Sequence, residues 1–264
     1  MTAKKISHQF GTQTQPIVIA HRGFSDEAPE NSLAAFRKAI DAGANMIELD
    51  VRLSADHHFT VFHDVRLQRT SNGRGALKNF DAAALVQFDN GSWFSSKFSK
   101  ERIPLLADVF PLVKERTLLN IEIKPDVIST NSTPAAAMIL EQARKARVLS
   151  KIIFTSFNHK IVKEIKSLDD SVVSGIIYHP LTNFRKSPAQ LAALAHADVF
   201  VCSKYQVNGD VVVDAQKSGY KVYVYGIKTE RDVKRMLHLG VEGMITNNPL
   251  FVQKTIHYLR SAEL

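Results

Sequence analysis

The chain has 264 residues, of which 45% are apolar and 23% are charged, a composition that is ordinary for one soluble globular domain. The formal net charge of +8 favours anionic partners, but the basic residues are scattered and no nucleic-acid-binding motif is present, so we expect no nucleic-acid partner. A single cysteine, Cys202, excludes an internal disulfide, and no apolar run reaches the length of a transmembrane helix.

The first 15 residues, MTAKKISHQFGTQTQ, are polar and contain no apolar stretch. We therefore predict a flexible N-terminal lead over residues 1–15 rather than a signal peptide. With the lone cysteine, this leads us to expect a reducing, cytoplasmic setting. The remaining residues, 16–264, are predicted to form a single domain.

From residue 17 onward, short apolar runs alternate with segments of helical periodicity. Eight runs are predicted to be strands, at 17–20, 46–51, 118–123, 151–157, 172–178, 199–203, 221–227 and 243–246. Helices are predicted between and after them, at 32–42, 105–115, 134–147, 159–168, 187–197, 210–218, 229–240 and 250–260. Because several strands are almost wholly apolar, they suit a parallel sheet that is buried on both faces. Eight β–α units predict a closed (β/α)8 TIM barrel, with an open doubly wound sheet as the alternative.

One segment interrupts this alternation between the second and third strands of the predicted barrel. It runs from about residue 54 to 117 and is too long for an ordinary connection. We predict a small insertion after the second strand, lying over one end of the barrel.

Charged side chains lie within or directly after three of the predicted strands. They are His21 and Arg22 after the first strand, Glu48 and Asp50 within the second, and Glu122 and Lys124 at the end of the third. Catalytic residues of barrels come from the C-terminal ends of the strands. We therefore expect these side chains to meet at one opening.

The carboxylates of this group indicate a metal site. Glu48 and Asp50 are two residues apart on a strand, so they point to the same face and would repel unless a cation or proton lies between them. With Glu122 as a third carboxylate, the set suits one hard divalent cation, Mg²⁺ or Ca²⁺. The alternative is that Glu48 or Asp50 forms a buried ion pair with an arginine.

Two histidines and an arginine add proton-transfer and phosphate-binding chemistry. His21 and Arg22 precede Gly23, which allows a tight turn at the strand end. Arg22 can hold a phosphate with two hydrogen bonds, and phosphodiester cleavage benefits from two proton-transfer groups, which His21 and His63 can supply. The alternative for His21 is a loop histidine with satisfied hydrogen bonds.

Several motifs of other hydrolases are absent from the sequence. There is no P-loop glycine pattern, no GxSxG, no HExxH and no paired CxxC. These absences argue against nucleotide hydrolases, serine hydrolases and zinc proteases.

A set of short motifs, read in order, resembles the glycerophosphodiester phosphodiesterase family over about residues 16–252. The motifs are AHRG (20–23), PENS (29–32), IELDV (47–51), FHD (62–64), GSWF (91–94), IP (103–104), EIK (122–124) and GVEGMITNNP (240–249). The resemblance implies a (β/α)8 barrel with a small insertion after the second strand. It also implies metal-dependent hydrolysis of glycerophosphodiesters to glycerol 3-phosphate and an alcohol.

Carried over by position, the resemblance implies a role for each candidate residue. These are His21 and His63 as the acid–base pair, Glu48, Asp50 and Glu122 as metal ligands, Arg22 and Lys124 as phosphate contacts, and Glu30 near the glycerol or behind the residues that contact it. Equally, Glu30 can be a helix N-terminal charge that favours the dipole. We favour His21 as the base and His63 as the acid.

Two departures from the family pattern bear on substrate preference. The family often has Trp-Thr-Val-Asn at the seventh strand, whereas this chain has the residues from Tyr225 to Lys228. Tyr225 is still expected to contact the glycerol. The family commonly ends the last strand with Thr-Asp, and Asn247 in this chain removes that charge.

Two other functions remain open from the sequence. A lysophospholipid substrate would need an apolar channel, for which the insertion offers Phe80, Trp93, Phe94 and Phe98, unless these residues only pack the insertion onto the barrel. A non-catalytic barrel that binds an anionic ligand is the third hypothesis. The sequence does not indicate the alcohol group, the choice between Mg²⁺ and Ca²⁺ or the oligomeric state. It also does not indicate whether the reaction uses water directly or a cyclic-phosphate route.

Overall fold

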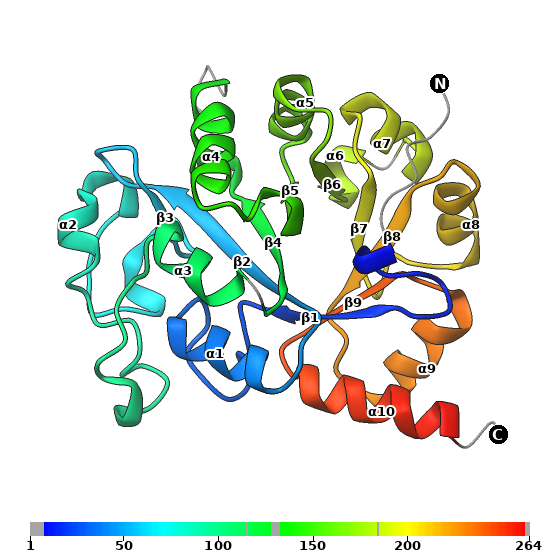
Figure 1. Ribbon diagram of the computed structural model, residues 1–264, viewed down its shortest axis with the longest axis horizontal. Helices are drawn as coiled ribbons and strands as arrows, with labels where there is room; N and C mark the ends of the chain where they lie inside the picture. Colours follow the sequence, from blue (N-terminus) through cyan, green and yellow to red (C-terminus); the bar gives the residue numbers. More distant parts are fainter. Residues whose placement is uncertain (1–7, 115, 128–132, 184, 262–264) are drawn as a thin grey trace.

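Eight parallel strands form a closed barrel in the computed structural model, which describes residues 8–114, 116–127, 133–183 and 185–261 (Figure 1). The strands are β1 (Ile17–His21), β2 (Met46–Leu53), β4 (Leu118–Ile123), β5 (Ile152–Ser156), β6 (Val173–Ile177), β7 (Val199–Ser203), β8 (Lys221–Tyr225) and β9 (Gly243–Thr246). Their order is β1-β9-β8-β7-β6-β5-β4-β2, and pairing between β1 and β2 closes the ring. The predicted TIM barrel and its eight strands are confirmed.

An outer layer of helices follows the strands one by one. The helices are α1 (Leu33–Asp41), α3 (Leu106–Val113), α4 (Thr133–Lys145), α5 (His159–Leu168), α6 (Pro180–Asn183), α7 (Pro188–Ala195), α8 (Gly209–Lys217), α9 (Glu230–Leu239) and α10 (Pro249–Ser261). Thr229 caps the N-terminus of α9, because its hydroxyl accepts a hydrogen bond from the Asp232 amide at 3.1 Å. None of the helices in these ranges combines the length and the apolar character needed to cross a bilayer.

The added structure after β2 is smaller than the predicted range of 54–117. Helix α3 belongs to the barrel, because it follows β2 and packs beside α1 in the outer layer. The insertion proper covers 54–105 and contains β3 (Phe59–Val61), which pairs with β2 in antiparallel fashion, together with α2 (Ala82–Leu85) and three 3₁₀ helices, η2 (Leu67–Arg69), η3 (Leu77–Asn79) and η4 (Ser96–Phe98). It lies beyond the C-terminal end of β2 and has its own small core around Phe62 and Leu67.

Side-chain alternation along the strands explains why chemistry collects at one end of the barrel. On β2, Met46 packs in the barrel interior, whereas Ile47 and Leu49 pack in the layer between sheet and helices. Because side chains alternate, Glu48 and Asp50 point inward like Met46, one and two levels further along the strand. The lower interior is therefore apolar, and the end at the C-termini of the strands, called the mouth below, is ionic.

The opposite end of the barrel, called the floor below, is closed by the N-terminal segment. Phe10, in η1 (His8–Phe10), is 2% exposed within the interior cluster, and the Tyr223 hydroxyl donates a hydrogen bond to its carbonyl at 2.7 Å. Gly243 leaves room for the Tyr223 ring, since a Cβ there would lie 2.5 Å from its Cδ1. The predicted N-terminal lead is thus packed onto the barrel at Phe10, whereas the flexibility of residues 8–15 stays a prediction. Residues 1–7 lie outside the described residues.

Candidate active site

A tight turn after β1 brings two of the predicted site residues to the mouth. Arg22 and Gly23 both have positive φ, 56° and 82°, and a Cβ on Gly23 would lie 2.7 Å from the backbone of Ala35. The Arg22 amide donates a hydrogen bond to Oε2 of Glu48 at 2.8 Å. The turn therefore holds the Glu48 carboxylate directly beside His21 and Arg22.

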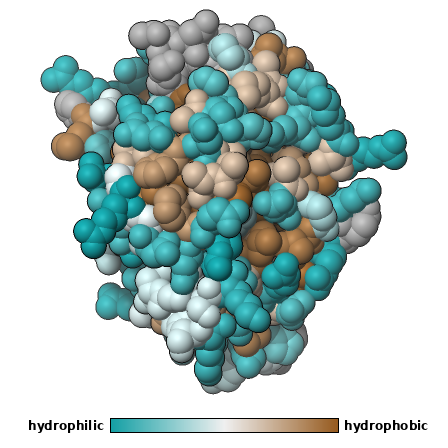
Figure 2. All heavy atoms as spheres, turned by 90° about the vertical axis from the view of Figure 1, so that its left-hand side faces the viewer, coloured by the Kyte–Doolittle hydropathy of each residue, from teal (hydrophilic) through white to brown (hydrophobic). Residues whose placement is uncertain are grey.

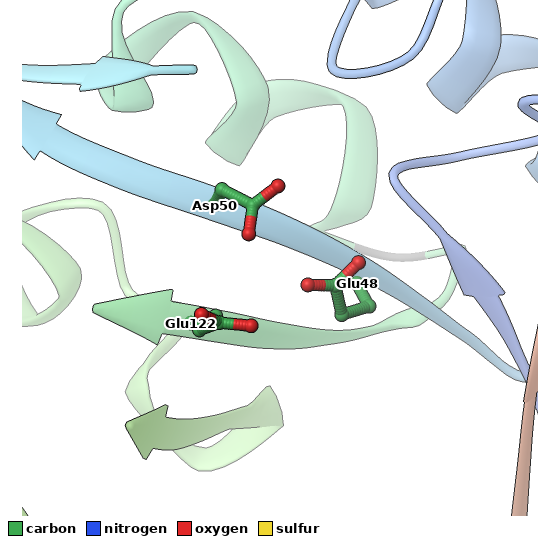
Figure 3. Close-up of side chains that lie close together, drawn as sticks. All are labelled: Glu48, Asp50 and Glu122. Atoms are coloured by element: carbon green, nitrogen blue, oxygen red, sulfur yellow. The ribbon is translucent and has the colours of Figure 1, made fainter. Parts of the chain in front are cut away.

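Three buried carboxylates meet at the mouth, as Figure 3 shows. Glu48 and Asp50 lie on β2, and Glu122 lies on the adjacent strand β4, where the parallel register places it opposite Asp50. One oxygen atom from each of the three residues lies within 4.8 Å of the others. The structure therefore brings together the three carboxylates that the sequence predicted.

Two cationic side chains pack against this triad. Lys124 Nζ lies 2.6 Å from Oε1 of Glu122 and 2.9 Å from Oδ1 of Asp50. Arg22 Nε lies 3.2 Å from Oδ2 of Asp50. The buried ion pair that the sequence left as an alternative is thus present at Asp50, beside the carboxylate cluster rather than instead of it.

The pKa values of the triad show that it is short of positive charge. Burial, together with the negative charges of Asp50 and Glu122, raises the pKa of Glu48 well above its ordinary value. Burial and the nearby Asp50 also raise the pKa of Glu122. Burial opposes ionisation of Asp50 as well, but Lys124 and Arg22 overcome it and lower its pKa. Three oxygen donors with charge still to be neutralised fit a hard divalent cation.

The His21 imidazole is half-buried and has one polar partner. Its Nδ1 donates a hydrogen bond to Oδ1 of Asn247 at 2.8 Å, which leaves Nε2 as a proton acceptor. Burial and the charge of Arg22 lower the pKa of His21 to about 4. The departure from the family pattern at Asn247 thus removes a charge but keeps a hydrogen-bond acceptor for this ring.

The second histidine is held by the insertion and has a different partner. His63 Nδ1 lies 2.6 Å from Oδ1 of Asp64, and because a carboxylate only accepts, the proton lies on Nδ1. The guanidinium of Arg52 donates two hydrogen bonds to the His63 carbonyl, at 2.8 and 2.6 Å. Arg52 also forms an ion pair with Asp126 in the loop after β4. The backbone and the ring of His63 are therefore fixed by separate contacts.

The loop between β1 and α1 supplies two further contacts. Asn31, with φ of 56°, donates from Nδ2 to Oδ2 of Asp50 at 2.8 Å and accepts from the Asp50 amide at 3.2 Å. Glu30 accepts a hydrogen bond from Nη1 of Arg22 at 2.7 Å and also pairs with Arg69. Glu30 therefore braces Arg22 from behind.

A cavity of about 220 Å³ joins these groups. Its wall consists of His21, Arg22, Glu48, His63, Asn120, Glu122, Lys124, Thr155, Phe157, Ile177, Val201, Tyr225 and Ile245. Among the predicted site residues, Glu30 and Asp50 lie behind this wall and the others form part of it. The side of the wall contributed by β5 to β9 is largely apolar.

The aromatic residues that the insertion offers for a lysophospholipid channel stack with neighbouring aromatic rings, and none of them lines the cavity at the mouth. Trp93, Phe94 and Phe98 stack edge-on in sequence, with ring centroids 5.7 Å apart at each step. Phe80 stacks on Phe88 and packs against the small core of the insertion. Figure 2 views the molecule from the side of the insertion and shows hydrophobic patches among hydrophilic residues.

Sequence reasoning missed four contact residues, namely Asn31, Arg52, Arg69 and Asn247. Asn31 lies in the motif PENS, which was a signal for it, and Asn247 was noted only as a lost charge. Arg52 and Arg69 act through loops whose conformation no local pattern specified.

Comparisons with known proteins match one family over most of the chain. A model of the glycerophosphoryl diester phosphodiesterase family matches residues 21–250, a range that includes every residue of the cavity wall. A glycerophosphodiester phosphodiesterase of Caldanaerobacter subterraneus subsp. tengcongensis is 33% identical over 234 residues, covering 88% of this chain and 94% of that protein. A solved phosphodiesterase of Oleispira antarctica, in complex with the product sn-glycerol-3-phosphate, is 28% identical with a TM-score of 0.83, covering 92% of this chain and 97% of that one. A solved glycerophosphodiester phosphodiesterase of Agrobacterium tumefaciens is 25% identical with a TM-score of 0.79, covering 90% and 100%.

Proposed function

The chain belongs to the glycerophosphoryl diester phosphodiesterase family, and from that premise we propose that it hydrolyses glycerophosphodiesters to glycerol 3-phosphate and an alcohol. One observation carries the proposal: two carboxylates, two cations and two imidazoles line a single small cavity, and the third carboxylate, Asp50, lies directly behind its wall. The product named for the Oleispira antarctica relative has the size and charge that such a cavity accepts.

We assign Glu48, Asp50 and Glu122 as the ligands of one divalent cation, Mg²⁺ or Ca²⁺. Bound there, the ion would supply Lewis-acid polarisation of a non-bridging phosphate oxygen. The raised pKa values of Glu48 and Glu122 support the assignment. A raised pKa favours the protonated carboxyl group, and a bound divalent cation can replace that proton. Titration calorimetry of the metal-free protein would then record ion binding with proton release, and no binding of either ion contradicts the assignment.

Arg22 and Lys124 are the proposed phosphate contacts. Both lie on the cavity wall, and burial does not neutralise them, since nearby acids raise the pKa of each. Fixed positive charge in a cavity stabilises the negative charge that develops on the phosphoryl oxygens in the transition state. Glu30 and Glu122 hold the two cations in place, so little reorganisation is required during the reaction.

The two histidines divide the proton transfers according to their partners. His21 has a neutral amide partner, so its free Nε2 is suited to accept the proton of the attacking oxygen. Burial, with the charges of Lys124 and Arg22, lowers the pKa of His63, whereas the nearby carboxylates oppose this shift. Because one of these carboxylates, Asp64, accepts a hydrogen bond from Nδ1, we assign His63 as the group that protonates the leaving alkoxide as the P–O bond breaks. The attacking oxygen belongs to water or, by a cyclic-phosphate route, to the 2-hydroxyl of the glycerol.

Lysophospholipids are the second candidate substrate class. The apolar wall formed by Phe157, Ile177 and Val201 favours them, because an alkyl group can pack there without losing hydrogen bonds. The volume of about 220 Å³ opposes them, since it is small beside the roughly 300–1,000 Å³ of typical small-molecule sites. Tyr225 on the same wall is the proposed contact for the glycerol of the preferred substrate.

A substrate panel tests the proposed reaction. Purified protein with Mg²⁺ or Ca²⁺ is incubated with glycerophosphocholine, glycerophosphoethanolamine, glycerophosphoglycerol and a long-chain lysophosphatidylcholine, and released glycerol 3-phosphate or lysophosphatidate is quantified. We expect turnover of the short diesters to exceed that of the lysolipid. Phosphate binding without turnover of any diester at any metal contradicts the proposal and supports the anion-binding barrel.

A further inference from the structure

Arg69 links the barrel to the insertion through a run of ion pairs. Its Nη1 and Nη2 donate to the two carboxylate oxygens of Glu30, at 2.9 and 2.7 Å. Its Nε and Nη2 donate to the two carboxylate oxygens of Asp64, at 2.6 and 3.0 Å. The run continues from Asp64 Oδ1 to Nδ1 of His63, 2.6 Å away. One guanidinium therefore connects a barrel loop to the imidazole that the insertion presents.

The shape of the guanidinium makes this double contact possible. Arginine presents five N–H donors in a rigid plane, so two of its edges can each hold a carboxylate with two hydrogen bonds. Glu30 is itself fixed by Arg22, 2.7 Å away, and its side chain is only 15% exposed. Glu30 is thus held in place on the barrel, and the Arg69 guanidinium, which binds both carboxylates, fixes Asp64 relative to it.

The electrostatics of Asp64 agree with this arrangement. Burial opposes ionisation of its carboxyl, but the hydrogen bonds from Arg69 and His63 lower its pKa to about 2. Asp64 therefore remains a charged acceptor that keeps the His63 proton on Nδ1 and leaves Nε2 for the cavity. The His63 backbone is held separately by Arg52, so only the ring orientation depends on Asp64.

We propose that Arg69 is a positioning residue that fixes the imidazole of His63 through Asp64, using Glu30 as its anchor on the barrel. The inference rests on the proposed function, because it assigns His63 as the group that protonates the leaving alkoxide. Misorientation of a reacting group by about 1 Å can cost on the order of a hundredfold in rate. The side chain of Arg69 is 44% exposed, so its ion pairs contribute little to global stability.

Two variants and a matched control test this role. Arg69→Gln removes the guanidinium that binds both carboxylates. Arg69→Lys keeps the positive charge but lacks the planar group that binds each carboxylate with two hydrogen bonds. The control is Arg144→Gln, since Arg144 is 48% exposed and pairs with one carboxylate, Asp169, at 2.7 Å on the outer helices. We expect Arg69→Gln to turn over glycerophosphocholine about 10–100 times more slowly than wild type, Arg69→Lys to recover part of the loss, and Arg144→Gln to stay within about twofold. Melting temperatures of the three variants should agree.

A change of leaving group separates positioning from a general structural effect. The 4-nitrophenyl ester of glycerol 3-phosphate releases a weakly basic phenolate that needs no proton, so an acid at His63 gives it no advantage. We expect Arg69→Gln to lose much less turnover on this ester than on glycerophosphocholine. Adding Arg69→Gln to His63→Ala should slow the reaction no further.

The outcomes distinguish this inference from the function on which it rests. The positioning role alone is overturned if Arg69→Gln loses the same factor in turnover on both esters. It is also overturned if Arg69→Gln turns over glycerophosphocholine at the wild-type rate while His63→Ala is impaired. If His63→Ala itself hydrolyses glycerophosphocholine at the wild-type rate, the proposed acid is wrong and the positioning role is wrong with it.

Discussion

The floor and the mouth of the barrel are built from the same strands by opposite means. At the floor, Phe10 and Tyr223 pack in an apolar layer, and the buried Tyr223 hydroxyl has a hydrogen-bond acceptor. At the mouth, the inward positions two and four residues further along carry Glu48, Asp50 and Glu122, which repel one another. The packing at the floor therefore stabilises the barrel and offsets the repulsion among the buried carboxylates at the mouth.

The backbone shows the same contrast. Arg22 and Asn31 at the mouth both adopt φ of 56°, a conformation that costs about 1–3 kcal/mol at residues other than glycine. Both are held there by contacts to the triad, since Arg22 binds Glu48 through its amide and Asn31 binds Asp50. Strain that the surroundings hold in place is typical of a site that is organised before its ligand arrives.

The largest expected effect concerns the floor. Phe10→Ala should lower the free energy of unfolding by about 3–5 kcal/mol, because it leaves a cavity where a ring that is 2% exposed now packs. Denaturant unfolding measures this loss, and Phe251→Ala, at an exposed position on α10, is the control. The kcat of folded Phe10→Ala protein should equal that of wild type, and a large loss of kcat would mean that the two ends are not independent.

The next effect concerns the mouth. His21→Ala should lower kcat by about a hundredfold or more, equivalent to roughly 2.7 kcal/mol of transition-state stabilisation, because it removes the proposed base. Steady-state kinetics on glycerophosphocholine measure the loss, and denaturant unfolding should find stability little changed or increased. Wild-type turnover of this variant would remove His21 from the reaction.

The smallest effect sharpens the role of Asn247. A base must be neutral, and with its pKa lowered to about 4 by burial and by Arg22, His21 stays neutral throughout the range above that pH. In Asn247→Asp a carboxylate would stabilise the imidazolium and raise the pKa of His21, so the acid limb of kcat/KM should move to higher pH by about one unit. The control is Asn248→Asp, the same change at the neighbouring residue, whose side chain caps α10. Both variants are assayed at saturating metal. An unmoved limb in Asn247→Asp contradicts the base role.

Local patterns were sufficient to predict the barrel and the residues on its strands. His21 and Glu48 could be identified because two-residue alternation and the ends of apolar runs specify both face and level along a strand. Arg69 could not, because its two carboxylate partners lie 5 and 39 residues away along loops of unknown path. Phe10 was missed for a related reason, since a single aromatic residue in a polar segment has no periodicity.

Metal dependence of turnover tests the account most directly. Wild-type protein is treated with excess EDTA, dialysed and assayed for glycerol 3-phosphate release from glycerophosphocholine, before and after Mg²⁺ or Ca²⁺ is restored. We predict that turnover is lost on chelation, returns with one of the two ions, and fails to return in Glu48→Gln/Glu122→Gln, which lacks two carboxylates of the triad. Full activity in excess EDTA would contradict a reaction that depends on those three carboxylates.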